Sequence, residues 1–322
     1  MNRLYLVAVL LSFSLAAAAQ PWPAAKPITM IVPYTPGGNV DFGARLIAAK
    51  MRDSLKQSVL VENVPGAGGV IGVTKTVQAP PDGYTILMGA DSPISIARFV
   101  TPSTVKYDSL RDLAPIGIVN AAPMIIVARP GLQANDLAGL LALARSQPGK
   151  LSYATSGVGT VLHLAMERVK QQTGIDVAHV PYKGGAQIIT DLIGNQIDLA
   201  MLVTVSAVPH VKAGKMKAFG VTTAQRMSSA PEIPALAESP ELKGFDMVAW
   251  TGLFAPAKTP PEIVARLNRE LNDALASPDV RGKFEEQGAV IGSGSPADFA
   301  AFLRKEQADF EKVVRAAGIK AE

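Results

Sequence analysis

Residues 28–45 constrain the fold of this chain most, because a strand pattern passes there through a pair of glycines into a helical pattern. The apolar side chains of residues 28–32 are typical of a buried parallel strand. Pro36 cannot continue that strand, and Gly37 and Gly38 form a corner at which backbone N–H groups can approach a ligand without an intervening side chain. The segment therefore predicts a strand, an anion-binding loop and a helix.

The helix after this corner is predicted from the spacing of its apolar residues, which recur at steps of three or four. Asn39 is expected to be its N-cap. A helix N-terminus carries unsatisfied N–H groups and about half a positive charge, so the corner can bind a carboxylate or a phosphate. The alternative is an ordinary turn between a strand and a helix. The apolar positions are Val40, Ala44, Ile47, Met51 and Leu55.

The order of strand, glycine-rich turn and helix recurs downstream. Alternation of this kind predicts an α/β protein with mostly parallel sheets. In the second half of the chain, the hydroxyl groups of Ser156 and Thr160 are expected to act as hydrogen-bond donors in one of these turns. The recurring units are strand 59–64 with turn 65–69 and helix 70–77, strand 151–154 with turn 155–160 and helix 162–169, and strand 177–180 with turn 181–185 and helix 186–193.

The remaining segments complete the predicted fold. The apolar run 113–127 is interrupted by prolines and a glycine, and we expect two strands there that cross from one lobe to another. Roughly 300 residues with 48% hydrophobic side chains are enough for two lobes with cores of their own. Further strands are predicted at 197–205, 216–221 and 245–255, and amphipathic helices from residue 260 onward and over residues 296–317.

Asp91 and Ser92 follow the predicted strand 84–88, at the sheet edge where open α/β proteins bind their ligands. A carboxylate at that place would repel an anionic ligand. We therefore favour the interpretation that Asp91 caps its own helix. The alternative is that the ligand presents a hydrogen-bond donor to Asp91, such as a hydroxyl, an amino group or a protonated acid.

The sequence lacks the residue patterns typical of nucleophilic, metal, dinucleotide and nucleic-acid sites. The chain has no cysteine, Ser156 is outside a G-x-S-x-G motif, and the three histidines do not have metal-ligand spacing, so we expect no metal and no nucleophilic site. The glycines in turn 65–69 miss the G-x-G-x-x-G register, and no cofactor is expected. The net charge of +4 is spread along the chain and does not indicate nucleic-acid binding. This pattern favours a protein that binds and releases an anion, with an exported hydrolase as the alternative.

Several motifs together resemble the Bug family, the substrate-binding proteins of tripartite tricarboxylate transporters. They are residues 33–41 with Ala44 and Arg45, 65–69, 155–160 with His163, and 180–184, followed by 209–215, 218–223, 250–256 and 313–319. The resemblance covers essentially the whole mature chain. It implies a two-lobe periplasmic binding protein of the Venus-flytrap type, similar to type II, in which each lobe is a mostly parallel sheet flanked by helices.

The resemblance also implies a domain organisation and partners. Residues 20–122 and 246–322 are expected to form lobe 1, and residues 123–245 lobe 2. The implied function is capture of a small carboxylate in the cleft between the lobes and its delivery to the membrane permease subunits of the transporter. The protein is expected to be a monomer in the periplasm. A receptor of the same fold that serves a sensor kinase remains an alternative.

In the Bug family the loop corresponding to residues 36–38 holds one carboxylate of the ligand, partly through ordered waters, and the loop corresponding to 156–160 faces it from the other lobe. The resemblance therefore implies a ligand site made from both lobes. Its candidate residues are Tyr34, Pro36, Gly37, Gly38, Asn39, Asp41, Ala67, Gly68, Asp91, Ser92, Ser156, Val158, Gly159, Thr160, His163, Tyr182, Lys183 and Thr204.

Two departures from the family pattern leave the ligand open. Residues 201–203 are apolar where relatives often carry an acid, and Asp91 stands where small hydroxyl residues are common. Both lie at predicted strand ends near the cleft. Candidate ligands are aliphatic dicarboxylates, citrate-like acids, aromatic carboxylates and acidic amino acids.

The first 19 residues are predicted to be a signal peptide, because Arg3 precedes an uncharged run to Leu15 and then four alanines. A membrane anchor is the alternative, although the apolar run is short for a bilayer. We expect mass spectrometry of the protein from its native host to show a chain that begins within a residue or two of Gln20. Recovery of the intact chain with Met1 would contradict this prediction.

Overall fold

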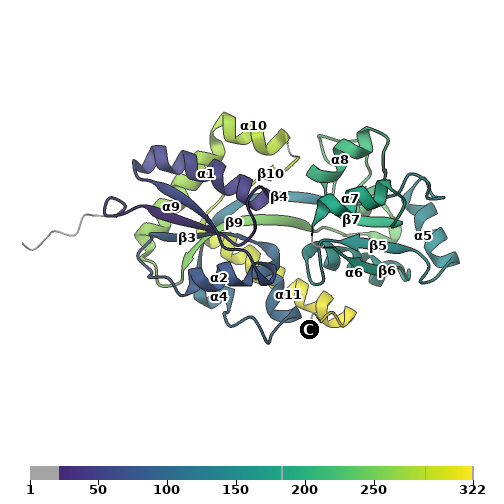
Figure 1. Cartoon of the computed structure of the whole chain (residues 1–322), viewed down its shortest axis with the longest axis horizontal. Coiled ribbons are helices and arrows are strands. Elements are labelled where there is room, and N and C mark those ends of the chain that lie inside the picture. The colour runs from purple at the N-terminus through teal and green to yellow at the C-terminus, as the bar shows by residue number, and fades with distance from the viewer. Residues whose placement is uncertain (1–21, 183, 287, 321–322) are drawn as a thin grey trace, which may run out of the picture.

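The structure is a computed structural model that describes residues 22–182, 184–286 and 288–320. These residues form two α/β lobes side by side, joined by long strands that run from one lobe into the other (Figure 1). The predicted signal peptide, residues 1–19, lies outside the described residues. Among the described helices, none is both long and apolar enough to cross a membrane.

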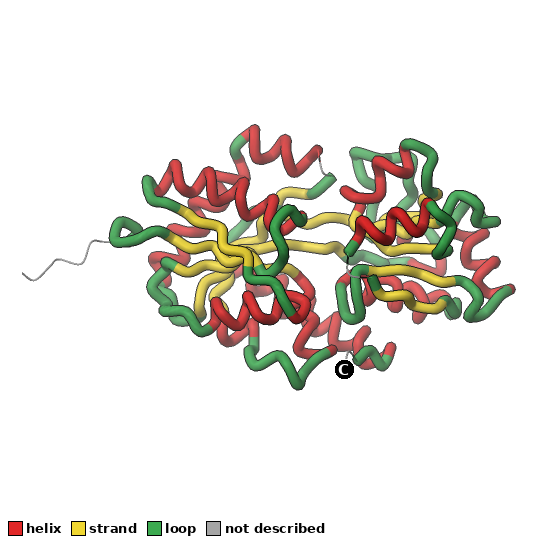
Figure 2. Tube along the Cα trace, in the orientation of Figure 1, coloured by secondary structure: helices red, strands yellow, loops and turns green. Residues whose placement is uncertain are grey.

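The sheet of lobe 1 begins with three parallel strands in the order β2 (Val59–Asn63), β1 (Ile28–Val32) and β3 (Thr85–Ala90). The strand β9 (Val248–Pro256) then pairs with β3 in the antiparallel sense. Apart from Thr29, the residues of strand β1 are apolar and inaccessible to solvent, as expected for a strand covered by helices on both faces (Figure 2).

Lobe 2 repeats this arrangement with β6 (Ala178–Pro181), β5 (Ser152–Thr155) and β7 (Leu199–Val203), which are also parallel. The strands β7 and β8 (Lys217–Val221) both pair with β4 (Leu113–Ala128) in the antiparallel sense. The predicted parallel sheets are therefore confirmed for three strands in each lobe, and the strands that connect the lobes are antiparallel.

The strand β4 is one continuous strand of 16 residues, not the two strands expected from its prolines and glycine. It pairs with β9 as far as Pro123 and with β7 from Met124 onward. The register shifts between Pro115 and Gly117, so the missing N–H of Pro115 is accommodated at an irregularity in the ladder. The prolines therefore do not end the strand.

Helices cover both faces of the combined sheet (Figure 2). The predicted amphipathic spacing is confirmed in α9, which buries Leu267, Leu271 and Leu275, and in α11, which buries Phe299, Leu303 and Phe310. A π-helical turn, η2, follows β3 and was not expected. The helices are α1 (Asn39–Leu55), η1 (Ala67–Gly69), α2 (Val70–Val77), η2 (Ser92–Ile96), α3 (Ala97–Val100), α4 (Ser109–Asp112), α5 (Leu137–Ser146), α6 (Val161–Thr173), α7 (Gly185–Ile193), α8 (Thr204–Lys212), η3 (Leu236–Glu238), η4 (Pro240–Leu242), α9 (Pro261–Ala276), α10 (Pro278–Glu286) and α11 (Pro296–Ala317), and β10 (Val290–Ile291) completes the sheet.

The C-terminal helix α11 belongs to the cores of both lobes. Phe299 and Leu303, in its first half, pack with Trp250 in lobe 1. Phe310 and Val314, in its second half, pack in the core of lobe 2. The helix is therefore a third connection between the lobes, beside β4 and β9.

The close packing of β9 against α11 yields a stability prediction. A Cβ at Gly252 would overlap the ring of Phe299, so Gly252→Ala is expected to destabilise the protein by about 1–3 kcal/mol. Gly282 in α10 has open space around it, and Gly282→Ala should stabilise by about 0.5–1 kcal/mol. Chemical denaturation of both variants tests the prediction, and equal effects in the two would contradict it.

Candidate functional site

A cavity of about 600 Å³ lies between the two lobes. Lobe 1 contributes the segments that follow β1, β2 and β3, and lobe 2 contributes the loop between β5 and α6. The crossing strands β4 and β9 add Asn120, Trp250 and Thr251. The cavity thus lies at the carboxyl ends of the parallel strands, where open α/β sheets bind ligands.

The structure brings ten of the eighteen predicted site residues together around this cavity: Tyr34, Asn39, Ala67, Gly68, Asp91, Ser92, Ser156, Val158, Gly159 and Thr160. Lys183 lies outside the described residues. Seven others do not line the cavity, namely Pro36, Gly37, Gly38, Asp41, His163, Tyr182 and Thr204. Thr204 was expected within a strand, but it is the first residue of α8.

Sequence reasoning missed the residues that the crossing strands place in the cavity. Asn120 and Thr251 are buried, and the Thr251 hydroxyl donates a hydrogen bond to the Asn120 side chain. Trp250 lies beside them on β9. No local signal marks these residues, because they lie inside apolar strands and reach the cavity only through the pairing of β4 with β9.

The glycine corner before α1 is held in place by Asp41. The carboxylate of Asp41 accepts hydrogen bonds from the backbone N–H of Gly37, from Arg45 Nε and from Asn63 Nδ2, each at 2.9 Å. The hydrogen bond from Arg45, the largest cause, and those from Gly37 and Asn63 lower the pKa of Asp41 to about 2, so the carboxylate is ionised at neutral pH. Its role in the structure is to fix the loop from behind.

Two expectations about this corner need correction. Gly38, not Asn39, is the N-cap of α1, and no side chain caps the helix there, since Asn39 is already helical and lines the cavity. The N–H of Gly37 was expected to be open to a ligand, but it is bonded to Asp41. The N-terminus of α1 still lies at the cavity, through Asn39 and Val40.

The second loop, residues 156–160, begins α6. Thr160 is the N-cap of α6: its hydroxyl accepts a hydrogen bond from the backbone N–H of His163 and donates one to the carbonyl oxygen of Gly157 at 2.9 Å. The Thr160 hydroxyl, expected as a donor to a ligand, is therefore used within the loop. The backbone N–H of Gly159 donates to Nδ1 of His163 at 3.0 Å.

The two loops are stabilised by the same type of hydrogen bond. In each, a glycine with a left-handed backbone, Gly37 at φ +83° and Gly159 at φ +73°, donates its N–H to the side chain four residues later. That side chain, Asp41 or His163, stands in the first turn of the helix that the loop begins. Both loops are thereby fixed by their own helices before any ligand arrives.

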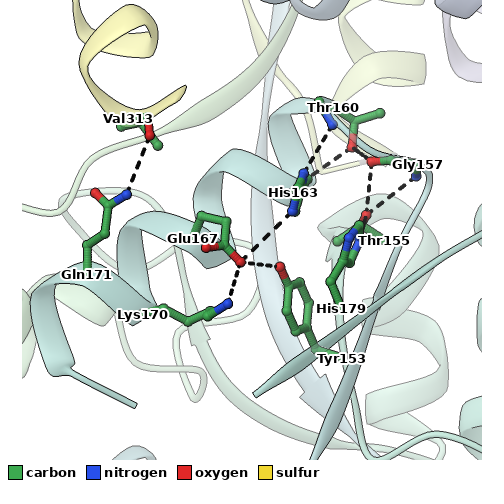
Figure 3. Close-up of polar contacts among 11 residues, drawn as sticks. Tyr153, Thr155, Gly157, Thr160, His163, Glu167, Lys170, Gln171, His179 and Val313 are labelled. Carbon is green, nitrogen blue, oxygen red and sulfur yellow. Dashed lines mark hydrogen bonds and ion pairs between the residues drawn. The ribbon is translucent and has the colours of Figure 1, made fainter. Parts of the chain in front are cut away.

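His163 belongs to a stack of rings behind the second loop (Figure 3). Its ring lies 4.0 Å from the ring of His179 with 11° between the planes, and the ring of Tyr153 stacks on His179 at 4.8 Å and lies 6.4 Å from His163. The Tyr153 hydroxyl donates to Glu167 at 2.6 Å, and Lys170 donates to the same oxygen. His163 therefore supports the loop from behind and does not line the cavity.

Both imidazoles are neutral in this stack. Burial lowers the pKa of His163, and burial together with neighbouring His163 lowers the pKa of His179 to about 4. Nδ1 of His163 can accept the N–H of Gly159 only while it carries no proton. The shape of the loop is thus linked to the neutral form of His163.

Asp91 does not cap a helix, contrary to expectation. Its Oδ1 accepts the hydroxyl of Ser92 at 2.7 Å and its Oδ2 accepts the backbone N–H of Trp250 at 3.0 Å. The backbone of Asp91 is itself helical, its side chain makes no capping hydrogen bond, and Pro93, one of the two usual donors to an N-cap, has no N–H. Burial raises the pKa of Asp91 despite these hydrogen bonds.

A second carboxylate lies on the opposite side of Trp250. Glu306 of α11 accepts the indole Nε1–H of Trp250 at 2.6 Å. Burial, and secondly the charge of Asp91, raise the pKa of Glu306 well above its usual value. Trp250 is therefore held between the cavity and α11 by two acidic side chains.

Two α/β lobes joined by crossing strands, with helix N-termini from both lobes at the cavity between them, define a two-lobe solute-binding protein. The chain belongs to the TctC family, the tripartite tricarboxylate transporter family receptors, whose family model matches residues 43–319. The resemblance found in the sequence is thereby confirmed. Proteins of this family bind substrates and are not enzymes, so the hydrolase alternative is set aside.

Individual relatives match along almost their whole length. Protein BugT of Bordetella pertussis is 35% identical over 329 residues, which cover 99% of each chain. The structure of R. palustris Rpa4515 with adipate has a TM-score of 0.84 at 34% identity and covers 93% of this chain and 100% of that one. MatC from Rhodopseudomonas palustris with bound malate has a TM-score of 0.80 at 32% identity, covering 90% and 99%.

The described residues contain no group of three or more His, Cys, Asp or Glu that could hold a metal ion. The polar groups at the cavity are instead hydroxyls, amides, helix N-termini and one carboxylate, which are Tyr34, Asn39, Asp91, Ser92, Thr101, Asn120, Ser156, Thr160 and Thr251. Hydroxyls, side-chain amides and helix N-termini can donate hydrogen bonds to a carboxylate.

The histidine stack predicts a pH dependence. Because the folded pKa values lie below the ordinary 6.5, the unfolded chain binds more protons, and stability should fall as the pH drops from 6.5 towards 4. His163→Asn keeps an oxygen acceptor near the position of Nδ1 and removes one titrating group, so its stability should fall less. Denaturation at pH 7 and pH 4.5 measures this, with His210→Asn on α8 as the matched control. An equal acid loss in His163→Asn and wild type would refute the link.

Proposed function

We propose that this protein captures a small carboxylate in the cavity between its lobes and delivers it to the permease of a tripartite tricarboxylate transporter. Membership of the receptor family supports the transport role. The relatives Rpa4515 and MatC, with adipate and malate, support a carboxylate as the ligand. The single observation that carries the proposal is a cavity on which the N-termini of α1 and α6, from different lobes, both lie.

Binding of this kind links the ligand to the arrangement of the lobes. Each helix N-terminus carries partial positive charge and N–H groups without intrahelical partners. A carboxylate can use both ends only when the lobes are close together, so it stabilises the closed arrangement. The N–H groups of Gly37 and Gly159 and the hydroxyls of Ser92, Thr160 and Thr251 already donate within the protein. The proposed donors to the ligand are therefore the later N–H groups of each loop and the hydroxyl of Ser156.

The same proposal includes a location and a domain organisation. We place the mature protein in the periplasm as a monomer, with lobe 1 made of residues 20–122 and 246–322 and lobe 2 of residues 123–245. The change of partner of β4 at Pro123 and Met124 supports the first boundary. The second half of α11 is an exception within residues 246–322, because Phe310 and Val314 pack in the core of lobe 2.

A binding screen tests the proposed function. The chain has two tryptophans, Trp22 and Trp250, and Trp250 lines the cavity, so Trp22→Phe turns its fluorescence into a reporter of ligand binding. A carboxylate at about a hundred times its dissociation constant should stabilise the fold by about 2.7 kcal/mol and change this fluorescence. The uncharged amide of each acid is the control. If no carboxylate gives both signals, or the amides match the acids, the proposed function is wrong.

A further inference from the structure

Among the described residues that line the cavity, Asp91 has the only acidic or basic side chain apart from the phenol of Tyr34. It stands at the end of β3, where the sheet meets the cavity, and 5% of its surface is exposed. The expectation that it caps a helix is wrong, as the geometry above shows. Asp91 is therefore a carboxylate that lines a cavity proposed to bind an anion.

The hydrogen bonds of Asp91 leave part of its capacity free. Each carboxylate oxygen has two lone pairs, and the hydrogen bonds from the Ser92 hydroxyl and from the Trp250 N–H use one on Oδ1 and one on Oδ2. The backbone N–H groups of Asp91 and Ser92 also favour the ionised carboxylate, but all of these donors are neutral and none offsets the negative charge. The carboxylate group can therefore accept further hydrogen bonds from a ligand in the cavity.

The neighbouring charge also favours a cation next to Asp91. Glu306 is the other acidic group close to Asp91, on the far side of Trp250, and it is negative or neutral but never positive. Burial raises the pKa of Asp91, which means that its ionised form lacks a compensating charge in the empty cavity. An ammonium group on the ligand would supply that charge directly.

On these grounds, and resting on the proposed function, we infer that Asp91 is a specificity-determining residue that binds the ammonium group of the ligand, so that the preferred ligands are amino-substituted carboxylates. The carboxylate of such a ligand lies at the helix N-termini, and its ammonium group donates to the free lone pairs of Asp91. A hydroxyl group could donate a hydrogen bond but would leave the charge of Asp91 unbalanced. An unsubstituted dicarboxylate would place like charges against each other.

Matched pairs of ligands test the preference in the wild-type protein. The pairs are succinate with aspartate, glutarate with glutamate, and adipate with 2-aminoadipate, and malate and 2-hydroxyglutarate probe a neutral donor. Calorimetry should show that at least one amino acid binds about tenfold or more tightly than both its unsubstituted parent and its hydroxy analogue. Parents or hydroxy analogues that bind as tightly as the amino acids in every pair would overturn the inference.

Asp91→Asn tests the residue itself. The amide keeps an acceptor for Trp250 and a partner for Ser92, but it carries no charge. We expect the preference for the amino ligand to fall by about tenfold or more, so that it is largely lost, with affinity for the parent acid unchanged or higher. Asp91→Ser serves as a second variant if the first does not fold, and the same loss is expected.

Glu306→Gln is the matched control, because it makes the same acid-to-amide change on the other side of Trp250, outside the cavity. It should retain the amino preference. A preference that survives in Asp91→Asn, or that is lost equally in Glu306→Gln, would overturn the assignment to Asp91. If none of these acids binds the wild-type protein, the inference about amino-substituted ligands fails and the wider carboxylate screen decides the proposed function. Tight binding of the parent acids alone would refute the role of Asp91 and leave the proposed function intact.

Discussion

The pairing of β4 with β9 is the interaction on which the rest of the structure depends. These two strands run antiparallel from lobe 1 into lobe 2, so backbone hydrogen bonds and not a flexible linker join the lobes. They also form the floor of the cavity, to which they contribute Asn120, Trp250 and Thr251. Any movement of the lobes must therefore bend the same strands that carry part of the site.

Both glycine-rich loops at the cavity are held in one conformation, and a different side chain does this in each lobe. A glycine-rich loop can approach an anion closely, but glycine also has the most conformational freedom to lose. An acceptor in the first helical turn, Asp41 in lobe 1 and His163 in lobe 2, binds a loop N–H and removes that freedom in advance. The lobes differ in consequence, because Asp41 stays ionised at neutral pH and His163 acts only as a neutral ring.

The sequence predicted local structure correctly wherever a single segment contains the residues that determine that structure. The strand β1, the glycine corner, and the amphipathic helices α9 and α11 follow from apolar spacing, proline and glycine. The prolines of β4 misled the same reasoning, because pairing on both sides outweighs the loss of single N–H donors at an irregular ladder. The helical start of α8 at Thr204 was likewise hidden in an apolar run.

The sequence by itself determined the α/β class, the order of the units, the two glycine loops and the family, because these depend on short-range patterns and ordered motifs. Only the tertiary structure decided which polar groups meet. Asp91 lies 159 residues from Trp250, and their hydrogen bond requires β3 and β9 to be neighbours. The partners of a buried carboxylate, and so the chemistry it can offer a ligand, depend on long-range packing that no local pattern records.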